Sequence, residues 1–144
     1  MFQLLSFGQE EPKEISQTPV VKENEKEDSE LTFVELEAPP IYPGCENTPI
    51  AEQRECFNTK LGEHVVRHFM YPKEALNNNI QGRVLVQFII DQEGRVEKIV
   101  TRGPHPLLEN EAFRIINRLP KMTPGKQKGK PVKVKYAIPI TFRI

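Results

Sequence analysis

The chain has 144 residues, enough for one domain of ordinary size, and its hydrophobic content of 38% is below the roughly 45–50% of a typical globular domain. We therefore expect part of the chain to lie outside any core, and no stretch approaches the roughly 18–20 apolar residues of a membrane-spanning helix. The net charge of zero hides an asymmetry: residues 1–41 carry 3 basic and 10 acidic side chains, a net −7, and residues 42–144 carry 17 and 10, a net +7.

The acidic segment 1–41 predicts a linker. Between residues 9 and 31 it lacks apolar periodicity, so it cannot offset the entropy lost on ordering and is expected to be disordered. Residues 1–9 hold a short apolar patch that ends on small and polar residues, which fits either a signal-peptide remnant or a plain terminus. We expect the folded domain to cover residues 42–144.

The chain has two cysteines, Cys45 and Cys56, eleven residues apart with Pro49 between them. A disulfide, two free thiols, and a zinc site completed by His64 and His68 are the three alternatives. We favour the disulfide, which at this separation would stabilise the fold by about 2–3 kcal/mol and would imply an oxidising compartment. No metal site is expected.

The spacing of apolar residues predicts a helix over residues 52–69. Its stripe recurs every four residues and has two further apolar side chains beside it: Phe57, Leu61, Val65 and Phe69, with Cys56 and Val66. Tyr71-Pro72 ends this helix, because a residue before proline is disfavoured in the helical region. A short helix over residues 73–77 follows, and three asparagines terminate it.

A β-hairpin comes next. Val84, Val86, Phe88 and Ile90 alternate on one face of a strand that opens at Gly82, while the other face carries Arg83, Leu85, Gln87 and Ile89. Residues 91–94 form the turn, and the returning strand over residues 95–101 alternates less cleanly, because Lys98 falls between two valines. A third helix then buries a stripe made of Leu108, Ala112, Ile115, Ile116 and Leu119.

The last segment, residues 132–144, alternates without a break and predicts a long strand. Its inward side chains are Val132, Val134, Tyr136, Ile138, Ile140, Phe142 and Ile144, and its outward side chains are Lys133, Lys135, Ala137, Pro139, Thr141 and Arg143. Pro139 favours an edge position, where the lysines either blunt the edge or flank a docking partner strand. The element order predicts an α+β fold, a three-stranded antiparallel sheet with helices packed on one face.

The sequence shows no catalytic constellation, so we expect neither enzyme activity nor a cofactor. Cys56 and His64 lie eight residues apart on one helix, too far to act as nucleophile and base, and His105 lies in a loop between two prolines. The outward face of the last strand is basic but has no aromatic residue on which bases could stack. We therefore expect no nucleic-acid binding.

Residues 71–142 carry a set of punctuating motifs in a distinctive order. They are Tyr71-Pro72, Gln81-Gly82-Arg83-Val84, Asp91 with Gly94, Pro106-Leu107-Leu108, Leu119-Pro120-Lys121, Pro124-Gly125-Lys126, Gly129-Lys130-Pro131-Val132 and Ile138-Pro139-Ile140 with Phe142. With these motifs the sequence resembles the C-terminal domain of the TonB family, in the form typical of Bacteroidetes envelope proteins. The resemblance covers about half the chain.

The resemblance implies a domain in the periplasm, exported and without a transmembrane helix in this chain, that binds outer-membrane receptors. A receptor segment, the TonB box, would add as a strand beside the last strand, at Val132, Lys133, Val134, Lys135, Tyr136, Ile138, Ile140, Phe142 and Arg143. Energy transduction would further require a membrane anchor and the inner-membrane ExbB–ExbD motor. The alternatives are an unanchored relative, or an envelope scaffold that binds peptidoglycan or forms a homodimer through the same edge.

Overall fold

The structure is a computed structural model that describes residues 31–32 and 36–144. The apolar patch and the linker predicted within residues 1–30 lie outside the described residues. The elements in chain order are β2 (Leu31–Thr32), η3 (Ile50–Glu52), α2 (Gln53–His68), α3 (Lys73–Asn77), β3 (Gly82–Ile90), β4 (Val96–Arg102), α4 (Pro106–Asn117), β5 (Lys126–Gln127), β6 (Lys130–Pro131) and β7 (Val134–Phe142). The three α-helices and the three long strands occur in the predicted order, with bounds that differ by only a few residues, whereas β2, η3, β5 and β6 were not predicted.

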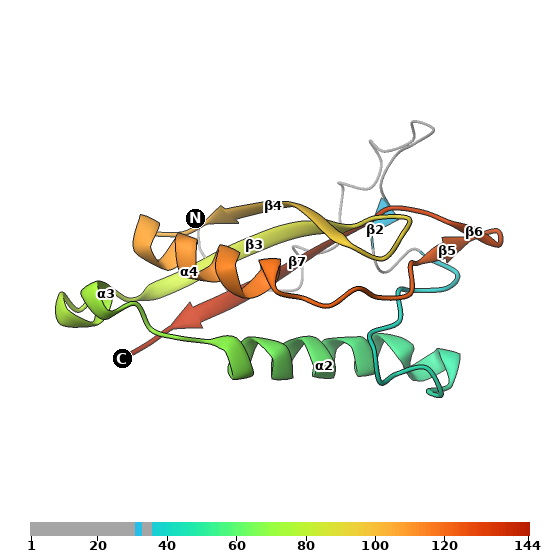
Figure 1. Ribbon diagram of the computed structural model, residues 1–144, viewed down its shortest axis with the longest axis horizontal. Coiled ribbons are helices and arrows are strands. Elements are labelled where there is room, and N and C mark those ends of the chain that lie inside the picture. The colour runs from blue at the N-terminus through green and yellow to red at the C-terminus, as the bar shows by residue number, and fades with distance from the viewer. Residues whose placement is uncertain (1–30, 33–35) are drawn as a thin grey trace, which may run out of the picture.

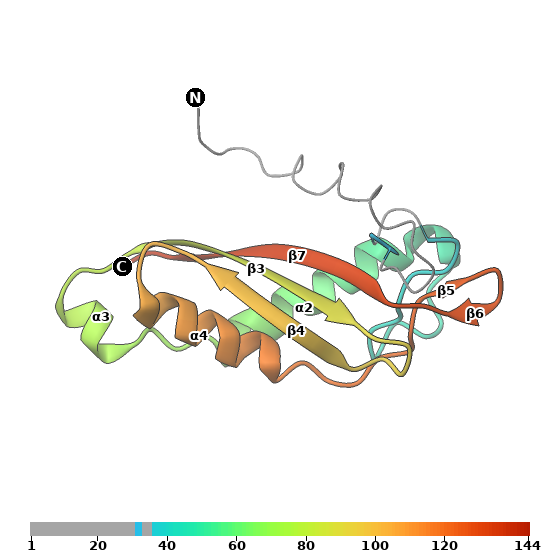
Figure 2. The same cartoon turned by 90° about the horizontal axis from the view of Figure 1, so that it is seen from above.

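The main sheet has the strand order β2-β7-β3-β4. Its three long strands are antiparallel, as predicted, and β3 lies between β7 and β4. The two-residue β2 is an addition that the sequence analysis did not foresee, and it pairs parallel with the start of β7. Helices α2 and α4 pack on the same face of the sheet, while β5 and β6 form a small separate hairpin (Figures 1 and 2).

The core lies between the sheet and these two helices. The predicted inward residues of β3 (Val84, Val86, Phe88 and Ile90) and four of those of α4 (Leu108, Ala112, Ile115 and Ile116) are buried. The fifth, Leu119, lies after the end of α4 and is half-buried. In α2 the predicted stripe was wrong at Val66, which is 78% exposed, and it omitted His64, which is only 2% exposed. At about 100° per residue, Val66 points roughly 180° away from Phe57, whereas His64 lies within roughly 20° of it. Val66, which was placed beside the stripe, therefore lies on the far side of the helix from the core, and His64 lies on the core side.

The uneven alternation of β4 has a local cause. The register between β3 and β4 shifts between Gln87 and Ile89, and Lys98 opposite this point has a positive φ of 51°. One extra residue is thus accommodated as a bulge, which turns the strand so that Val96 and Ile99 both pack toward the core.

Residues 36–41, which the sequence analysis placed in the linker, lie against the folded domain. Leu36 is only 6% exposed, and its side chain approaches Gly125. Ala38 forms an isolated bridge with Lys126, as does Ile41 with Thr123.

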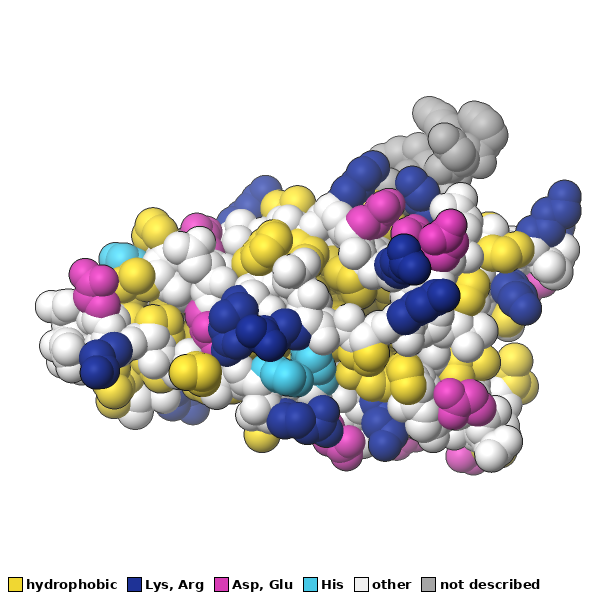
Figure 3. Space-filling view, in the orientation of Figure 1, with side chains coloured by type: hydrophobic (Ala, Val, Ile, Leu, Met, Phe, Trp, Pro, Cys, Tyr) yellow, Lys and Arg dark blue, Asp and Glu magenta, His cyan; other side chains and the backbone are white. Residues whose placement is uncertain are grey.

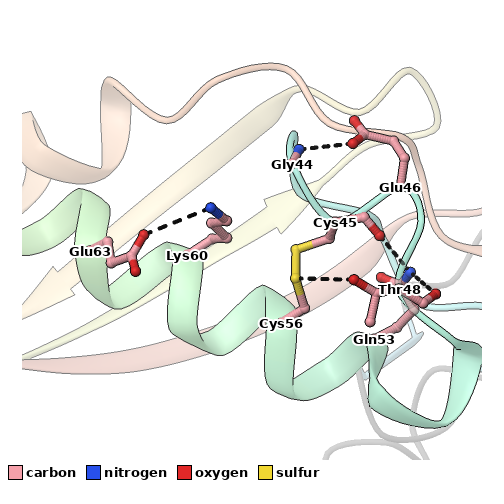
Figure 4. Close-up of a disulfide and its surroundings, with 8 residues drawn as sticks. All are labelled: Gly44, Cys45, Glu46, Thr48, Gln53, Cys56, Lys60 and Glu63. Carbon is pink, nitrogen blue, oxygen red and sulfur yellow. Dashed lines mark hydrogen bonds and ion pairs between the residues drawn. A yellow bond between two sulfur atoms is a disulfide. The ribbon is translucent and has the colours of Figure 1, made fainter.

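Cys45 and Cys56 form a disulfide that ties the loop before α2 to its second turn (Figure 4). Cys45 is fully buried, and the Gln53 side chain donates to the carbonyls of Cys45 and Thr48 at 2.8 and 2.9 Å. Of the three alternatives for these cysteines, the structure contains the disulfide, which was the favoured one, and not free thiols or a zinc site.

We expect a Cys45→Ser/Cys56→Ser variant to lose about 2–3 kcal/mol of unfolding free energy, because its unfolded chain is no longer constrained by the cross-link. Urea titrations with and without reductant measure this difference. Reductant should destabilise the natural protein and leave the variant unchanged. Equal stability of the oxidised protein and the variant would contradict the prediction.

Candidate partner-binding edge

The two sides of β7 are used very differently. One side pairs with β3 over nine residue pairs without a break, from Gly82↔Phe142 to Ile90↔Val134. On the other side β2 pairs with β7 at two positions, Leu31↔Val134 and Thr32↔Lys135. In the described part of the chain no strand pairs with the outer side of residues 137–142.

Pro139 decides which backbone groups this open edge presents. It has no N–H to donate, and its pairing with Leu85 lies within the unbroken register, so its nitrogen faces away from β3. Because the backbone groups of alternate residues face the same side of a strand, Ala137 and Thr141 direct both N–H and C=O outward. Pro139 adds a third outward carbonyl. The edge thus offers two donors and three acceptors to an incoming strand.

The apolar residues expected at the site anchor β7 to the core. Val134, Ile140 and Phe142 are buried, and Val132 and Ile138 are half-buried and pack against the same cluster. The Phe142 ring lies 5.1 Å from that of Phe69. These side chains hold the edge in place.

Tyr136 is anchored as well. Its ring makes edge contacts with Phe57 and Phe88 at 5.2 and 5.6 Å, and its hydroxyl donates to the Asn58 side chain of α2. Burial raises the pKa of Tyr136 to about 12, so the hydroxyl stays protonated at neutral pH.

Of the three basic residues expected to guide a partner, only Arg143 is exposed. Lys133 is half-buried and forms an ion pair with Glu97 of β4 at 3.3 Å. Lys135 is half-buried, and its register partner on β3, Ile89, is only 5% exposed.

Two hollows adjoin the open edge. The first, of about 370 Å³, lies between α2 and β7 and is lined by Val65, Val66, Phe69, Pro139, Ile140 and Thr141. The second, of about 420 Å³, lies at the end of β7 and is lined by Gln81, Gly82, Arg83, Thr141, Phe142 and Arg143. The sequence analysis missed the contributions of α2 and of Arg83. The apolar Val66 beside the helix stripe was the one available signal, and it was interpreted as core.

The contact between α2 and α4 is polar where α2 ends. Nε2 of the buried His64 lies 2.8 Å from the Ile115 carbonyl, and its ring centre is 4.4 Å from that of His68. Burial, with smaller contributions from His68 and Arg67, lowers the pKa of His64. Figure 3 shows basic side chains beside the histidines between α2 and α4. Among the described residues no group of three or more His, Cys, Asp or Glu side chains is arranged to hold a metal.

The lowered pKa of His64 predicts a pH dependence of stability. The unfolded chain binds a proton at His64 near pH 6.5 while the folded chain does not, so stability is complete above that pH and falls as the pH drops below it. A His64→Gln variant should lose this part of the slope. Urea midpoints from pH 7.5 to 5 compare the two proteins, and parallel slopes would contradict the assignment.

Fold and edge together define a small α+β domain with an exposed, half-paired last strand. The profile of the family described as Gram-negative bacterial TonB protein C-terminal matches residues 67–144, more than half of the chain, and the chain belongs to this family. It is also similar to the solution NMR structure of the Pseudomonas aeruginosa TonB CTD. The two share 27% identity, with a TM-score of 0.43, over 52% of this chain and 77% of that one. A search of curated proteins found no match.

The family assigns the chain a TonB-like role. Its C-terminal domains are periplasmic and non-catalytic, and they interact with outer-membrane receptors. The match begins within α2, so the disulfide lies outside it. None of the helices in the described residues is long and apolar enough to cross a membrane.

Proposed function

We propose that this domain binds an extended segment of an outer-membrane receptor by β-strand addition to residues 137–142 of β7. The observation that carries the proposal is the set of outward-facing backbone groups on Ala137, Pro139 and Thr141. No strand in the described residues pairs with these groups, whereas the other side of β7 is fully paired with β3. Main-chain hydrogen bonds to such an edge supply affinity, and pockets for alternate side chains supply specificity.

The pairing with β2 limits the length of the incoming strand. Because β2 occupies the outer side of Val134 and Lys135, a partner would bind after Lys135 and span about six residues. This is shorter than the site expected from sequence, which began at Val132. The parallel direction of β2 supports the view that this edge accepts a parallel neighbour.

We further propose that the chain acts in the periplasm after export, which the disulfide supports because such bonds persist in oxidising compartments. Energy transduction belongs to the same proposal: a form of the protein with a membrane anchor would have ExbB–ExbD as its second partner.

Site-specific photocrosslinking tests the strand addition. A benzophenone side chain at position 141 should crosslink to the periplasmic segment of an outer-membrane receptor, whereas the same group at position 100, exposed on β4, should not. A synthetic peptide of the captured segment should then lose binding when alternate amides are N-methylated, and only for one of the two alternate sets. Crosslinking from position 100 alone, or equal effects of both methylation sets, would reject the proposal.

The same open edge favours one second candidate function, a homodimer in which two copies pair through β7. Sedimentation over a range of concentrations distinguishes the two. The dimer would be favoured if the mass doubles as the concentration rises and if a substitution at Thr141 abolishes this doubling.

A further inference from the structure

The β5–β6 hairpin carries a group of positive charges that the proposed function does not use. Lys126, Lys128 and Lys130, the three hairpin lysines, are all exposed. They belong to residues 112–144, which contain nine basic and no acidic side chains. Within the described part of the chain, none of their three ammonium groups forms an ion pair with a carboxylate. These charges are therefore available to an anionic partner.

The hairpin projects from one end of the molecule. It forms a separate two-stranded sheet, and it lies at the end opposite the C-terminus (Figures 1 and 2). Figure 3 shows basic side chains standing out from the surface at this end. Residues 128–131 are all exposed, and no heavy atom of the described residues lies within 4 Å of a Cβ built on Gly129. The described domain thus leaves the tip open to a flat surface.

The tip holds a lysine at a backbone position that lysine rarely adopts. Lys128 and Gly129 have φ values of 54° and 78°, and a type I′ turn, which prefers asparagine followed by glycine, requires positive values at both positions. A carboxylate oxygen of Glu37 accepts the backbone N–H of Lys128 at 2.9 Å, and Ala38 forms a bridge with Lys126. The turn is thus fixed from outside the hairpin, with a charged side chain where asparagine would fit better. Such a placement points to a role for the side chain.

The three hairpin lysines diverge rather than converge. Lys126 pairs with Pro131 and Gln127 pairs with Lys130, so Lys126 and Lys130 lie on opposite faces of the hairpin, while Lys128 lies at the tip. Diverging charges cannot surround one small anion, and an acidic peptide along one face would meet only some of them. Each can contact a different phosphate where the tip enters a layer of headgroups. The hairpin has no aromatic side chain on which nucleic-acid bases could stack.

We propose that the tip of the β5–β6 hairpin binds a membrane surface rich in anionic phospholipid, with each hairpin lysine near a different phosphate. A lysine near such a surface contributes about fivefold to the partition coefficient. Because β7 runs away from the hairpin toward the opposite end of the molecule, this contact would leave the far end of β7 accessible (Figures 1 and 2). The inference goes beyond the proposed function and does not depend on strand addition.

Cosedimentation of the full oxidised chain with vesicles tests the inference. We expect binding to vesicles made of equal parts phosphatidylglycerol and phosphatidylcholine, and none to phosphatidylcholine alone. The triple variant Lys126→Gln/Lys128→Gln/Lys130→Gln should bind roughly 100-fold more weakly. The corresponding triple arginine variant, which keeps the charge, should bind like the natural protein. Binding should also be lost in about 1 M salt, where the Debye length is about 3 Å.

A second triple variant provides the matched control. Lys73→Gln/Arg102→Gln/Arg118→Gln removes the same charge from exposed positions of α3, of the end of β4 and just after α4. It should bind the anionic vesicles nearly as tightly as the natural protein. All six substituted positions are exposed, so both variants should fold, and their amide spectra check this.

Four outcomes would overturn the inference. Absence of binding to the anionic vesicles, or equal binding to the neutral ones, would exclude an anionic membrane surface. Equal losses for the two triple glutamine variants would show that net charge and not the hairpin is responsible. Amide shifts of residues 126–131 that soluble glycerol phosphate reproduces at the same phosphate concentration would indicate a site for a single anion. Tighter binding to polyglutamate than to the vesicles would replace the membrane with an acidic protein. Crosslinking from position 141 tests strand addition separately from all of these.

Discussion

Replacing Gly94 with alanine should destabilise the fold by about 4 kcal/mol or more. Gly94 ends the β3–β4 turn with a φ of 87°, and its carbonyl accepts from the backbone N–H of Met122 at 2.8 Å. A Cβ at this position would lie 1.7 Å from the Met122 carbonyl oxygen, a backbone atom that cannot rotate away. Either the hairpin turn or the segment around the buried Met122 would have to move. Chemical denaturation of the variant measures the loss.

Two other glycines provide matched controls. Gly129 has a similar φ of 78° but open space around it, so Gly129→Ala should cost only the backbone strain, about 1 kcal/mol. Gly62 lies in α2 without a close neighbour, so Gly62→Ala should stabilise the protein by about 0.5–1 kcal/mol. If Gly94→Ala costs no more than Gly129→Ala, steric contact with Met122 is not the cause.

Replacing Arg114 with methionine should cost about 3 kcal/mol, the second large effect. The guanidinium donates to both carboxylate oxygens of Glu111 at 2.8 Å and to the His68 carbonyl at 2.5 Å, where α2 ends. Glu111 also accepts from the backbone N–H of Met70 at 2.8 Å, and it is only 8% exposed. Removing the arginine would leave a buried carboxylate without its cation and a helix-terminal carbonyl without its donor.

Conservative and distant substitutions check this account. Arg114→Lys keeps the charge but not the two-pronged geometry, so it should lose about half as much. Arg118→Met, at an exposed position just after α4, should stay within about 0.5 kcal/mol of the natural protein. Equal losses for Arg114→Met and Arg118→Met would show that the network at the end of α2 contributes nothing measurable.

This network also bears on the proposed function. Arg114 and Glu111 hold the end of α2 against α4, and Val65 and Phe69, near that end, line the hollow between α2 and β7. A protein with Arg114→Met that remains folded should therefore bind the crosslinked receptor segment less tightly, because one wall of that hollow is less well fixed.

Local signals in the sequence were enough to predict the three α-helices and the three long strands. Proline, glycine and asparagine mark the ends of α3 and of the β3–β4 turn, and these effects act within a few residues. The alternation in β3 and β7 predicted which faces pack on the core, because a strand has only two faces. It failed at Ile89, which is buried, and at Ile144, which was assigned inward and is 55% exposed beyond the end of β7. Together they determined the α+β fold and identified β7 as an edge strand. The resemblance to the TonB family rests on the same punctuation.

Only the tertiary structure decided how that edge is shared and what lies beside it. The pairing of β2 with Val134 and Lys135 joins segments about 100 residues apart, and no local pattern specifies such a contact. The ion pair of Lys133 with Glu97 and the exposure of Val66 likewise depend on which elements pack together and at what angle. Periodicity states that a residue faces the core or the solvent, but the shape of a groove between a helix and a strand is set by the packing of both.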